Sequence, residues 1–406
     1  MRISLLLQRE PFDAIFEKTL ASFLQSRFQK SYTVKWRKAF SSVNPNSQVW
    51  LCNPYLNAIF VNKVNKEVLL PVIQEFSRST VWWRRPFQKL YVDLSTKQWA
   101  CKWFAPYIVE ISPALKRPEN ILILGGNHHI RLLDYNEGET FVIHKTGFES
   151  RFLYNDIYLR RENPYLPCPR IHEVSEEGLW YSEELILGTP INRLKDVKQG
   201  KDAVKDVMTS LCKLYGKTAR KVYAVEYVSG IIDRIKGCIR KYSYFNKETG
   251  DSILNDLSGL IEMIRFQECK KIIVAQTHGD FQPANILVGE KQPWLIDWEY
   301  TAERQIAYDW LVFALEARSS QGLGQRVSQA INADMPQCEQ LQSTVPHVQW
   351  QDREERSSIL MLFILEELEL KIMEVCNPFF FRFDQGFEAF WKEAKQIMLD
   401  IAGTCR

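Results

Sequence analysis

The sequence predicts an α+β protein in which an antiparallel sheet is followed by a largely helical region, with a further α+β module in front of both. Residues 119–145 contain three short apolar runs separated by turn-forming residues, which is typical of a β-meander. Residues 200–271 and several segments after residue 309 repeat apolar side chains at helical spacing. We therefore expect three parts, with boundaries at 1–115, 116–190 and 191–406.

Composition places the chain among soluble globular proteins, because 46% of its 406 residues are hydrophobic and 25% are charged. The longest apolar run, ILMLFIL at 359–365, is too short to cross a bilayer and is expected to form a buried helix. The first residues, MRISLLLQREPF, lack the apolar length of a signal peptide, so we expect a cytoplasmic protein without a transmembrane segment. Nine cysteines without a CxxC pair predict reduced, mostly buried thiols.

Charge is distributed unevenly along the chain. Residues 1–120 hold 18 Lys and Arg against 8 Asp and Glu, a balance of +10 in a chain whose total is +3. The same part is rich in tryptophan, in stretches such as VKWRKAF and VWWRRPF. This composition fits an anionic surface or a phosphorylated ligand, and nucleic acid is the less expected partner. The alternative, which we favour, is a module with buried tryptophans and a solvated basic face.

The meander carries the first candidate site residues. Its strands are NILIL, IRLLDY and TFVIHK, and alternation on the last strand places Phe141, Ile143 and Lys145 on one face. A lysine on an apolar face needs an anionic partner, which phosphate oxygens or a carboxylate would supply. The connection GGNHH contains Gly125 and Gly126, which would let backbone N–H groups approach an anion closely.

A second group of polar residues surrounds a predicted hairpin in HGDFQPANILVGEKQPWLIDWE, residues 278–299. The runs ILV and WLI read as two strands joined by the turn-rich GEKQP. Entry and exit of a hairpin lie side by side, so Asn285 and Asp297 should meet despite their separation in sequence. An amide oxygen and a carboxylate suit magnesium, which fills its other positions with water and phosphate oxygens. The pattern therefore predicts a site for a metal-bound nucleotide.

HGDFQPAN resembles the catalytic loop of the aminoglycoside phosphotransferase and choline kinase family, the small-molecule branch of the protein-kinase-like fold. LIDWE resembles the metal-binding segment of that family, VIHK its lysine-bearing strand, and LWYSEELILGTPINRL the strand and hinge between its lobes. AYDWL resembles the helix start that follows the metal segment. The likeness covers roughly residues 120–315 and implies a bilobal fold, with an antiparallel β N-lobe and a helical C-lobe.

The resemblance implies a role for each matching residue. Asp280 would accept or orient the attacking hydroxyl, and Asn285 and Asp297 would hold magnesium against the phosphates. Lys145 would bind phosphate oxygens. Glu149 would fix Lys145, with Asp156 as the alternative partner.

The other matching residues have supporting roles. Gly125 and Gly126 would approach the phosphates, and Glu184 and Leu185 lie in the hinge that presents backbone groups to the adenine of ATP, or to GTP as the alternative nucleotide. Asp309 of AYDWL is expected to be structural, and His278 to brace the loop by hydrogen bonding.

The resemblance predicts an ATP- and Mg-dependent kinase that phosphorylates a hydroxyl of a small molecule, such as a sugar, an amino alcohol or an aminoglycoside-like acceptor. The alternatives are a catalytically weak pseudokinase, a nucleotide-sensing or scaffolding module, and a kinase that acts on protein. The acidic run EELELK, residues 366–371, would suit a cationic acceptor, although such a run on a helix is typically a solvated face, which we expect here.

Overall fold

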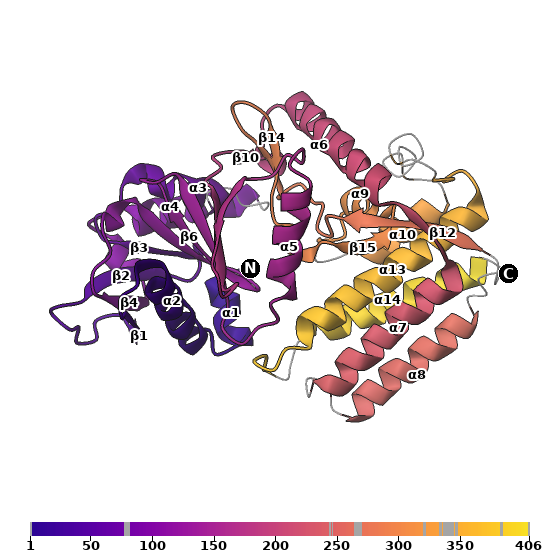
Figure 1. The fold of residues 1–406 in the computed structure, drawn as a ribbon, viewed down its shortest axis with the longest axis horizontal. Helices are drawn as coiled ribbons and strands as arrows, with labels where there is room; N and C mark the ends of the chain where they lie inside the picture. Colours follow the sequence, from indigo (N-terminus) through magenta and orange to yellow (C-terminus); the bar gives the residue numbers. More distant parts are fainter. Residues whose placement is uncertain are drawn as a thin grey trace. The chain divides into compact units, whose positions relative to one another are not determined.

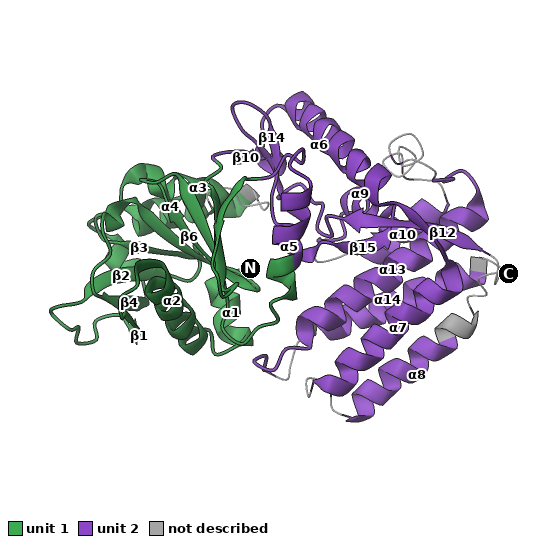
Figure 2. Cartoon of the chain, viewed as in Figure 1, with its two compact units in different colours: residues 1–154, 169–186 green, residues 155–168, 187–406 purple. Residues whose placement is uncertain are grey.

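The computed structural model describes residues 2–76, 82–242, 245, 247–263, 270–319, 322–332, 335, 345, 348–381 and 385–404. The chain forms two compact units (Figures 1 and 2). The first comprises Met1–Tyr154 and Pro169–Ile186, and the second comprises Asn155–Cys168 and Leu187–Arg406. The expected boundary after residue 190 lies close to the observed one, whereas the expected boundary after residue 115 falls inside the first unit.

A nine-stranded antiparallel sheet explains why residues 1–115 are not separate. Its strand order is β1-β4-β2-β3-β5-β6-β7-β9-β8. The strand β3 pairs with β5, with Ile59 opposite Ile123, so the N-terminal strands and the meander form one continuous sheet. Neither β3 nor β5 is therefore an unpaired edge strand. The strands are β1 (Thr33–Lys38), β2 (Gln48–Asn53), β3 (Ala58–Val61), β4 (Tyr107–Ser112), β5 (Ile121–Gly125), β6 (His129–Asp134), β7 (Glu139–His144), β8 (Ile171–Val174) and β9 (Trp180–Glu184).

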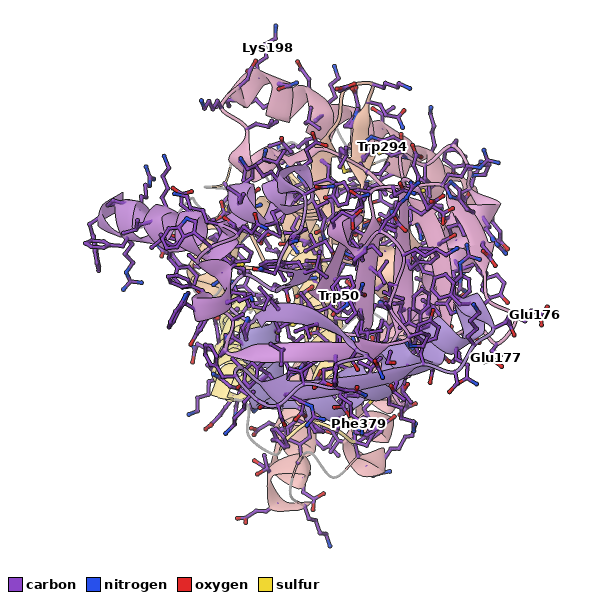
Figure 3. The ribbon with its side chains drawn as sticks, turned by 90° about the vertical axis from the view of Figure 1, so that its left-hand side faces the viewer. Trp50, Glu176, Glu177, Lys198, Trp294 and Phe379 are labelled. Atoms are coloured by element: carbon purple, nitrogen blue, oxygen red, sulfur yellow. The ribbon has the colours of Figure 1, made fainter. Side chains whose placement is uncertain are left out.

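The predicted meander is confirmed as β5, β6 and β7, which pair in sequence order. The turn between β6 and β7 contains Gly138 at φ +70°, a conformation that glycine adopts without strain. The helix expected after Lys145 is α5 (Arg151–Glu162). Figure 3 shows Trp50 inside the first unit and Glu176 and Glu177 projecting from the turn between β8 and β9.

Helices cover both faces of the sheet because its strands are apolar on both faces. On β2, Trp50 and Cys52 belong to the core shared with α1 and α2, while Leu51 belongs to the core under α3 and α4. This alternation is the period-two pattern of a strand. The helices are α1 (Ile3–Arg9), α2 (Phe12–Phe28), α3 (Lys66–Phe76) and α4 (Arg85–Thr96), with 3-10 turns η1 (Trp82–Arg84), η2 (Cys101–Phe104) and η3 (Pro118–Asn120).

The second unit is mainly helical, as predicted. Its longest helix, α13, contains the run at 359–365, and every side chain of that run is buried. Its helices are α6 (Val197–Thr218), α7 (Ala224–Lys241), α8 (Lys247–Met263), α9 (Tyr308–Ala314), α10 (Leu323–Ile331), α13 (Arg353–Val375) and α14 (Gln385–Thr404), with η4 (Ile191–Arg193) and η5 (Trp298–Tyr300).

Two small sheets in the second unit carry the candidate catalytic segment. One has the order β10-β13-β14 and the other β11-β12-β15. The segment begins directly after β12, passes through the hairpin β13–β14 and returns to β15. The strands are β10 (Thr189–Pro190), β11 (Arg220–Tyr223), β12 (Lys271–Thr277), β13 (Ile286–Val288), β14 (Pro293–Leu295) and β15 (Ala302–Gln305).

Two sequence expectations concern the chain as a whole. Among the residues that the structure describes, no helix has the length and apolarity needed to cross a membrane. Cys52, Cys101, Cys168, Cys212, Cys238 and Cys376 are free thiols. The remaining cysteines, Cys269, Cys338 and Cys405, lie outside the described residues.

Candidate active site

The loop after β12 is fixed through its backbone by Asp309, which is fully buried near the start of α9. Its carboxylate accepts hydrogen bonds from the backbone N–H of His278 at 2.7 Å and of Gly279 at 2.8 Å. Tyr215 donates a third hydrogen bond at 2.8 Å. Burial, followed by the charge of Asp309, raises the pKa of Tyr215, which keeps this hydroxyl a donor. Asp309 therefore has the structural role that the resemblance implied.

Gly279 is required by both conformation and space. Its φ of +87° is one that other residues rarely adopt, and a Cβ there would lie 2.1 Å from the carbonyl oxygen of Tyr300. A side chain at this position would therefore displace the loop that carries Asp280.

His278 braces the loop, as expected. Its Nε2 lies 3.0 Å from the carbonyl oxygen of Ile296, and its Nδ1 lies 3.2 Å from the backbone N–H of Asp280. Because a carbonyl only accepts and an N–H only donates, Nε2 is the donor and Nδ1 the acceptor in these two contacts. The ring also packs edge-on against Trp298, with centroids 4.6 Å apart. The histidine thus links the loop to the exit of the hairpin, directly after β14.

The Asp280 carboxylate is held by residues of its own loop. Its Oδ2 accepts hydrogen bonds from Gln282 Nε2 at 2.7 Å and from Asn285 Nδ2 at 2.8 Å. Asn285 Nδ2 also donates to the backbone oxygen of Asp280 at 2.9 Å. The residue is 8% exposed, so this carboxylate is held in a largely buried position.

The predicted hairpin is confirmed, and it brings the two candidate metal ligands to its open end. Ile286 pairs with Leu295, and Ile296 N–H donates to the Asn285 carbonyl at 3.0 Å, so Asp297 stands one residue beyond the position opposite Asn285. Asp297 has φ +68°, a left-handed conformation that an aspartate tolerates better than most residues and that often marks functional sites.

The residues present fit a magnesium ion chemically. Both hydrogens of Asn285 Nδ2 are used by Asp280, which leaves the amide oxygen Oδ1 as an acceptor for another group. The carboxylate of Asp297 completes the pair of oxygen donors that such an ion takes from protein. Among the described residues, no group of three or more His, Cys, Asp or Glu is placed to hold a metal ion.

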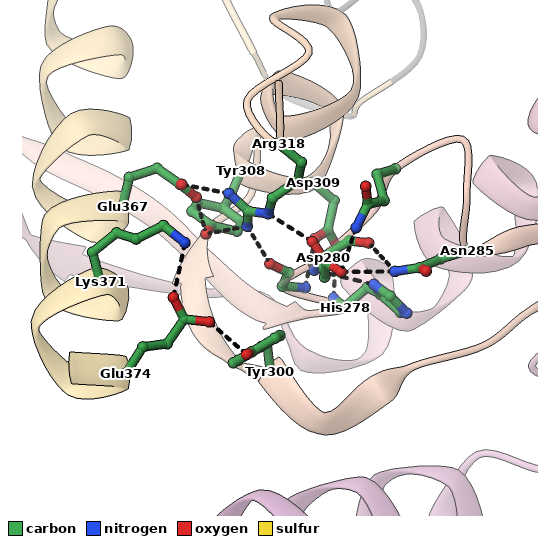
Figure 4. A network of polar contacts seen from close by, with 12 residues as sticks. His278, Asp280, Asn285, Tyr300, Tyr308, Asp309, Arg318, Glu367, Lys371 and Glu374 are labelled. Carbon is green, nitrogen blue, oxygen red and sulfur yellow. Dashed lines mark hydrogen bonds and ion pairs between the residues drawn. The ribbon is translucent and has the colours of Figure 1, made fainter. Parts of the chain in front are cut away.

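Sequence reasoning missed Arg318, which lies beyond the end of α9. Its Nε contacts Asp280 Oδ1 at 2.6 Å, and its Nη2 donates to the Gly279 carbonyl at 2.9 Å (Figure 4). Its Nη1 pairs with Glu367 of α13. The guanidinium therefore holds the candidate base from the side opposite Asn285. The only sequence signal was an arginine after an apolar helix, which no spacing rule connects to Asp280.

The acidic run on α13 is not a solvated face, so that expectation is wrong. Glu366 and Glu367 are each 1% exposed, because this side of α13 packs into the second unit. Gln305 N–H donates to Glu366 at 2.7 Å, and Tyr308 donates to Glu367. One turn further along, Lys371 pairs with Glu374 at 2.8 Å (Figure 4). These carboxylates are occupied by internal partners.

In the first unit, Lys145 follows β7 and is fully buried. Its Nζ contacts Glu10 Oε1 at 2.5 Å and lies over the rings of Phe12 and Phe148 at 5.1 and 5.0 Å. Glu10 caps the C-terminal end of α1, and its second oxygen contacts Arg9 at 2.8 Å. A carboxylate from the N-terminal helix therefore holds the lysine.

The expected pairing of Lys145 with Glu149 is corrected by these contacts. Glu149 pairs with Arg151 at 3.1 Å, and the alternative, Asp156, pairs with Arg160 at 2.6 Å. Glu149 is too exposed to be the buried partner, since its side chain is 39% accessible. The sequence offered no sign of Glu10, which precedes Lys145 by 135 residues.

The glycines of GGNHH have packing roles. A Cβ on Gly125 would lie 2.8 Å from Ile3 of α1, and the Gly125 carbonyl accepts a hydrogen bond from Asn57 at 2.9 Å. A Cβ on Gly126 would lie 2.7 Å from the His129 carbonyl. Close approach of α1 and a tight turn account for both glycines, and their contact with a nucleotide stays a prediction.

The hinge residues are likewise engaged within the first unit. Glu184 N–H donates to the Arg170 carbonyl, and Leu185 N–H donates to the Gly138 carbonyl, both at 2.9 Å. These two N–H groups are already paired, so an adenine base would have to be recognised by other hinge groups.

No known protein-family profile matches the chain, and no curated protein matches its sequence. Solved structures do match. A choline/ethanolamine kinase family protein from Mesorhizobium loti is 14% identical, with 78% of this chain and 94% of that chain covered and a TM-score of 0.45. The ethanolamine kinase of Plasmodium vivax is 11% identical, with 83% and 94% covered and a TM-score of 0.42. A thermostable mutant of aminoglycoside phosphotransferase APH(4)-Ia, in ternary complex with ADP and hygromycin B, is 14% identical, with 70% and 93% covered and a TM-score of 0.44.

The chain has an α+β fold, with a nine-stranded antiparallel sheet in one unit and a mainly helical second unit. It resembles the choline kinases and aminoglycoside phosphotransferases, as its motifs predicted.

Proposed function

We propose that the protein is an ATP- and magnesium-dependent phosphotransferase that phosphorylates a hydroxyl group of a small molecule. The observation that supports this most is the arrangement around Asp280. Asn285 holds its carboxylate at 2.8 Å, and the hairpin brings Asp297 back to the same end. A carboxylate that can orient a hydroxyl beside two oxygen donors for a divalent ion is what phosphoryl transfer requires.

Each residue has a defined task in this proposal. Asp280 orients the attacking hydroxyl and accepts its proton late in the reaction, so positioning matters more than basicity. Gln282 and Asn285 prevent its carboxylate from rotating. Asn285 Oδ1 and Asp297 would hold magnesium, which when bound neutralises charge on the phosphate oxygens.

Lys145 supplies positive charge for the phosphates of the nucleotide. Its ammonium is kept in one orientation by Glu10, at 2.5 Å, and by two aromatic rings. A preorganised ammonium group would bind the α- and β-phosphate oxygens without reorganisation during the reaction.

A direct test is turnover of the purified full-length chain with ATP, magnesium and a panel of sugars, amino alcohols and aminoglycosides. Asp280→Asn and Asp297→Asn should each lower turnover by at least about 1000-fold, a loss typical for removal of a group that acts on the reacting atoms. Asp196→Asn, which changes an exposed helix cap on α6, should leave turnover unchanged.

Two results would contradict the proposal. Near-normal turnover in Asp280→Asn would show that the site is assigned wrongly. Tight ATP binding without turnover of any acceptor, measured by calorimetry on the unmodified chain, would instead favour the nucleotide-sensing alternative.

A further inference from the structure

Large apolar side chains are exposed along one side of α4 and of the 3-10 turn η1 that precedes it. Trp83, Phe87 and Leu90 are 52, 70 and 57% exposed. They are spaced four and three residues apart, which places them on the same side of a helix. Val92 and Ser95 are buried on the side that packs onto the sheet. The outward side of α4 is therefore an apolar stripe.

A second exposed group lies next to α4. Trp99 and Trp103 are 72 and 78% exposed, and Phe40 is 81% exposed with its ring 6.3 Å from that of Trp103. The ring of Tyr91 on α4 packs against Phe104 of η2 at 5.4 Å, which keeps η2 beside α4. The expectation of buried tryptophans is therefore correct for Trp50 but wrong for these residues.

Exposed basic residues alternate with the exposed rings along this segment of the chain. Residues 82–104 contain one acidic residue, Asp93, which is half-buried. The Arg84 guanidinium lies 4.9 Å from the Trp83 ring centroid, so charge and aromatic surface are presented together. The segment contains five basic residues, all of them exposed: Arg84, Arg85, Lys89, Lys97 and Lys102.

We propose that this aromatic-basic surface, formed by α4, η1, η2 and Phe40, docks onto an anionic lipid bilayer. Tryptophan rings are suited to the membrane–water interface, and lysine and arginine are attracted to anionic headgroups. An amphipathic helix that is basic and aromatic on its exposed side lies in the plane of such an interface. Binding is peripheral, because the apolar residues are at the surface of a folded unit.

The lipid surface fits better than nucleic acid for a physical reason. Leu90 has no ring on which a base could stack, yet it is exposed in line with Trp83 and Phe87. Burying this stripe in acyl chains removes apolar area from water, which a phosphate backbone does not. This proposal is independent of the catalytic activity.

The charge contribution is tested with the full-length chain and vesicles of phosphatidylcholine with or without phosphatidylserine. Binding should require phosphatidylserine and weaken steeply with salt. Combined Arg84→Glu, Arg85→Glu and Lys89→Glu substitutions should weaken it by about 100-fold or more, at ~1 kcal/mol per basic residue removed. The matched control combines Lys198→Glu, Lys201→Glu and Lys205→Glu on the exposed side of α6 and should bind normally.

The apolar contribution is tested separately. Phe87→Ser with Leu90→Ser should weaken binding to the same vesicles by at least about 10-fold, from the lost burial of two large side chains. Val197→Ser with Val225→Ser changes exposed apolar residues elsewhere and should have no effect. Unchanged circular dichroism would verify the fold of each variant.

Three outcomes would overturn the proposal. The first is no binding to vesicles that contain phosphatidylserine, and the second is an equal loss in the α4 and α6 variants. The third is duplex DNA or RNA that binds more tightly than the vesicles and loses affinity in the same α4 variants.

Discussion

Lys145 and Asp280 are each held by a charged partner from another part of the chain, but the two ion pairs differ in burial. The side chains of Lys145 and Glu10 are both 0% exposed, whereas those of Arg318 and Asp280 are 16 and 11% exposed. Asp280 also has two partners within its own loop. The lysine therefore depends on a distant helix for its orientation, while the aspartate is positioned mainly by its immediate neighbours.

The largest expected effect follows from the buried pair. Glu10→Ala leaves the Lys145 ammonium without this carboxylate, and breaking a buried pair costs roughly 3–5 kcal/mol. Hydrogen exchange should show that β7 loses protection while α13, in the other unit, does not. Glu67→Ala, at an exposed glutamate of α3, is the control. Unchanged protection of β7 in Glu10→Ala would mean that the pair contributes little to stability.

The two units should respond to pH in opposite directions. In the first unit, burial and then the charge of His129 lower the pKa of His144 to about 4 from a usual 6.5. The folded unit thus binds fewer protons than the unfolded chain, so its stability is present above pH 6.5 and is lost as pH falls through about 4. The free energy of unfolding should change by on the order of 3 kcal/mol over this range, and His144→Gln should remove this pH dependence.

In the second unit, burial raises the pKa of Glu366 to about 7 from a usual 4.5. Here the folded state binds more protons, so stability is present below pH 4.5 and is lost as pH rises through about 7. The size is again on the order of 3 kcal/mol, and Glu366→Gln should remove it. Hydrogen exchange of β7 and α13, measured from pH 4 to 8 and corrected for intrinsic exchange rates, reports the stability of each unit separately. If the stabilities of the two units changed with pH in the same direction, both assignments would be wrong.

Gly279→Ala tests how strongly the position of Asp280 depends on the backbone of its own loop. The new methyl group would meet the Tyr300 carbonyl and displace the aspartate, so turnover should fall by about 100-fold, as for an ångström-scale misplacement. Gly216→Ala on α6 has open space around the added methyl group and should leave turnover unchanged while stabilising the helix. Comparable turnover in both variants would show that the loop tolerates movement.

The smallest effect is expected at Arg318. Lysine keeps the charge but cannot contact Asp280, Gly279 and Glu367 together, so Arg318→Lys should lower kcat about 10-fold with little change in the KM for the nucleotide. Arg220→Lys alters an exposed pair with Glu303 and should have no effect on either constant. A change in KM alone would indicate that Arg318 contacts the nucleotide and does not position Asp280.

Local patterns predicted much of the molecule. The meander, the helices of the second unit and the hairpin were all readable, because each depends on alternation or helical spacing within a short segment. The adjacency of Asn285 to the exit of the hairpin followed from the geometry of two paired strands. The bracing role of His278 and the structural role of Asp309 also agree with the motif.

Sequence patterns gave wrong predictions where the burial of a side chain depended on residues far away in the sequence. Glu366 and Glu367 looked like a solvated face, and only the neighbours of α13 reveal that they are buried. Trp99 and Trp103 were expected inside a small module, whereas the face they belong to has no covering element among the described residues.

The amino-acid sequence alone determined the meander, the hairpin, the helices of the second unit and the composition of the Asp280 loop, because these depend on patterns among near neighbours in the chain. Only the tertiary structure decided that Glu10 pairs with Lys145, that Arg318 pairs with Asp280, and that the N-terminal strands extend the meander's sheet. Such contacts join segments far apart in sequence, and many residues of suitable charge compete for each one. Burial of the packed faces, and not spacing along the chain, selects among them.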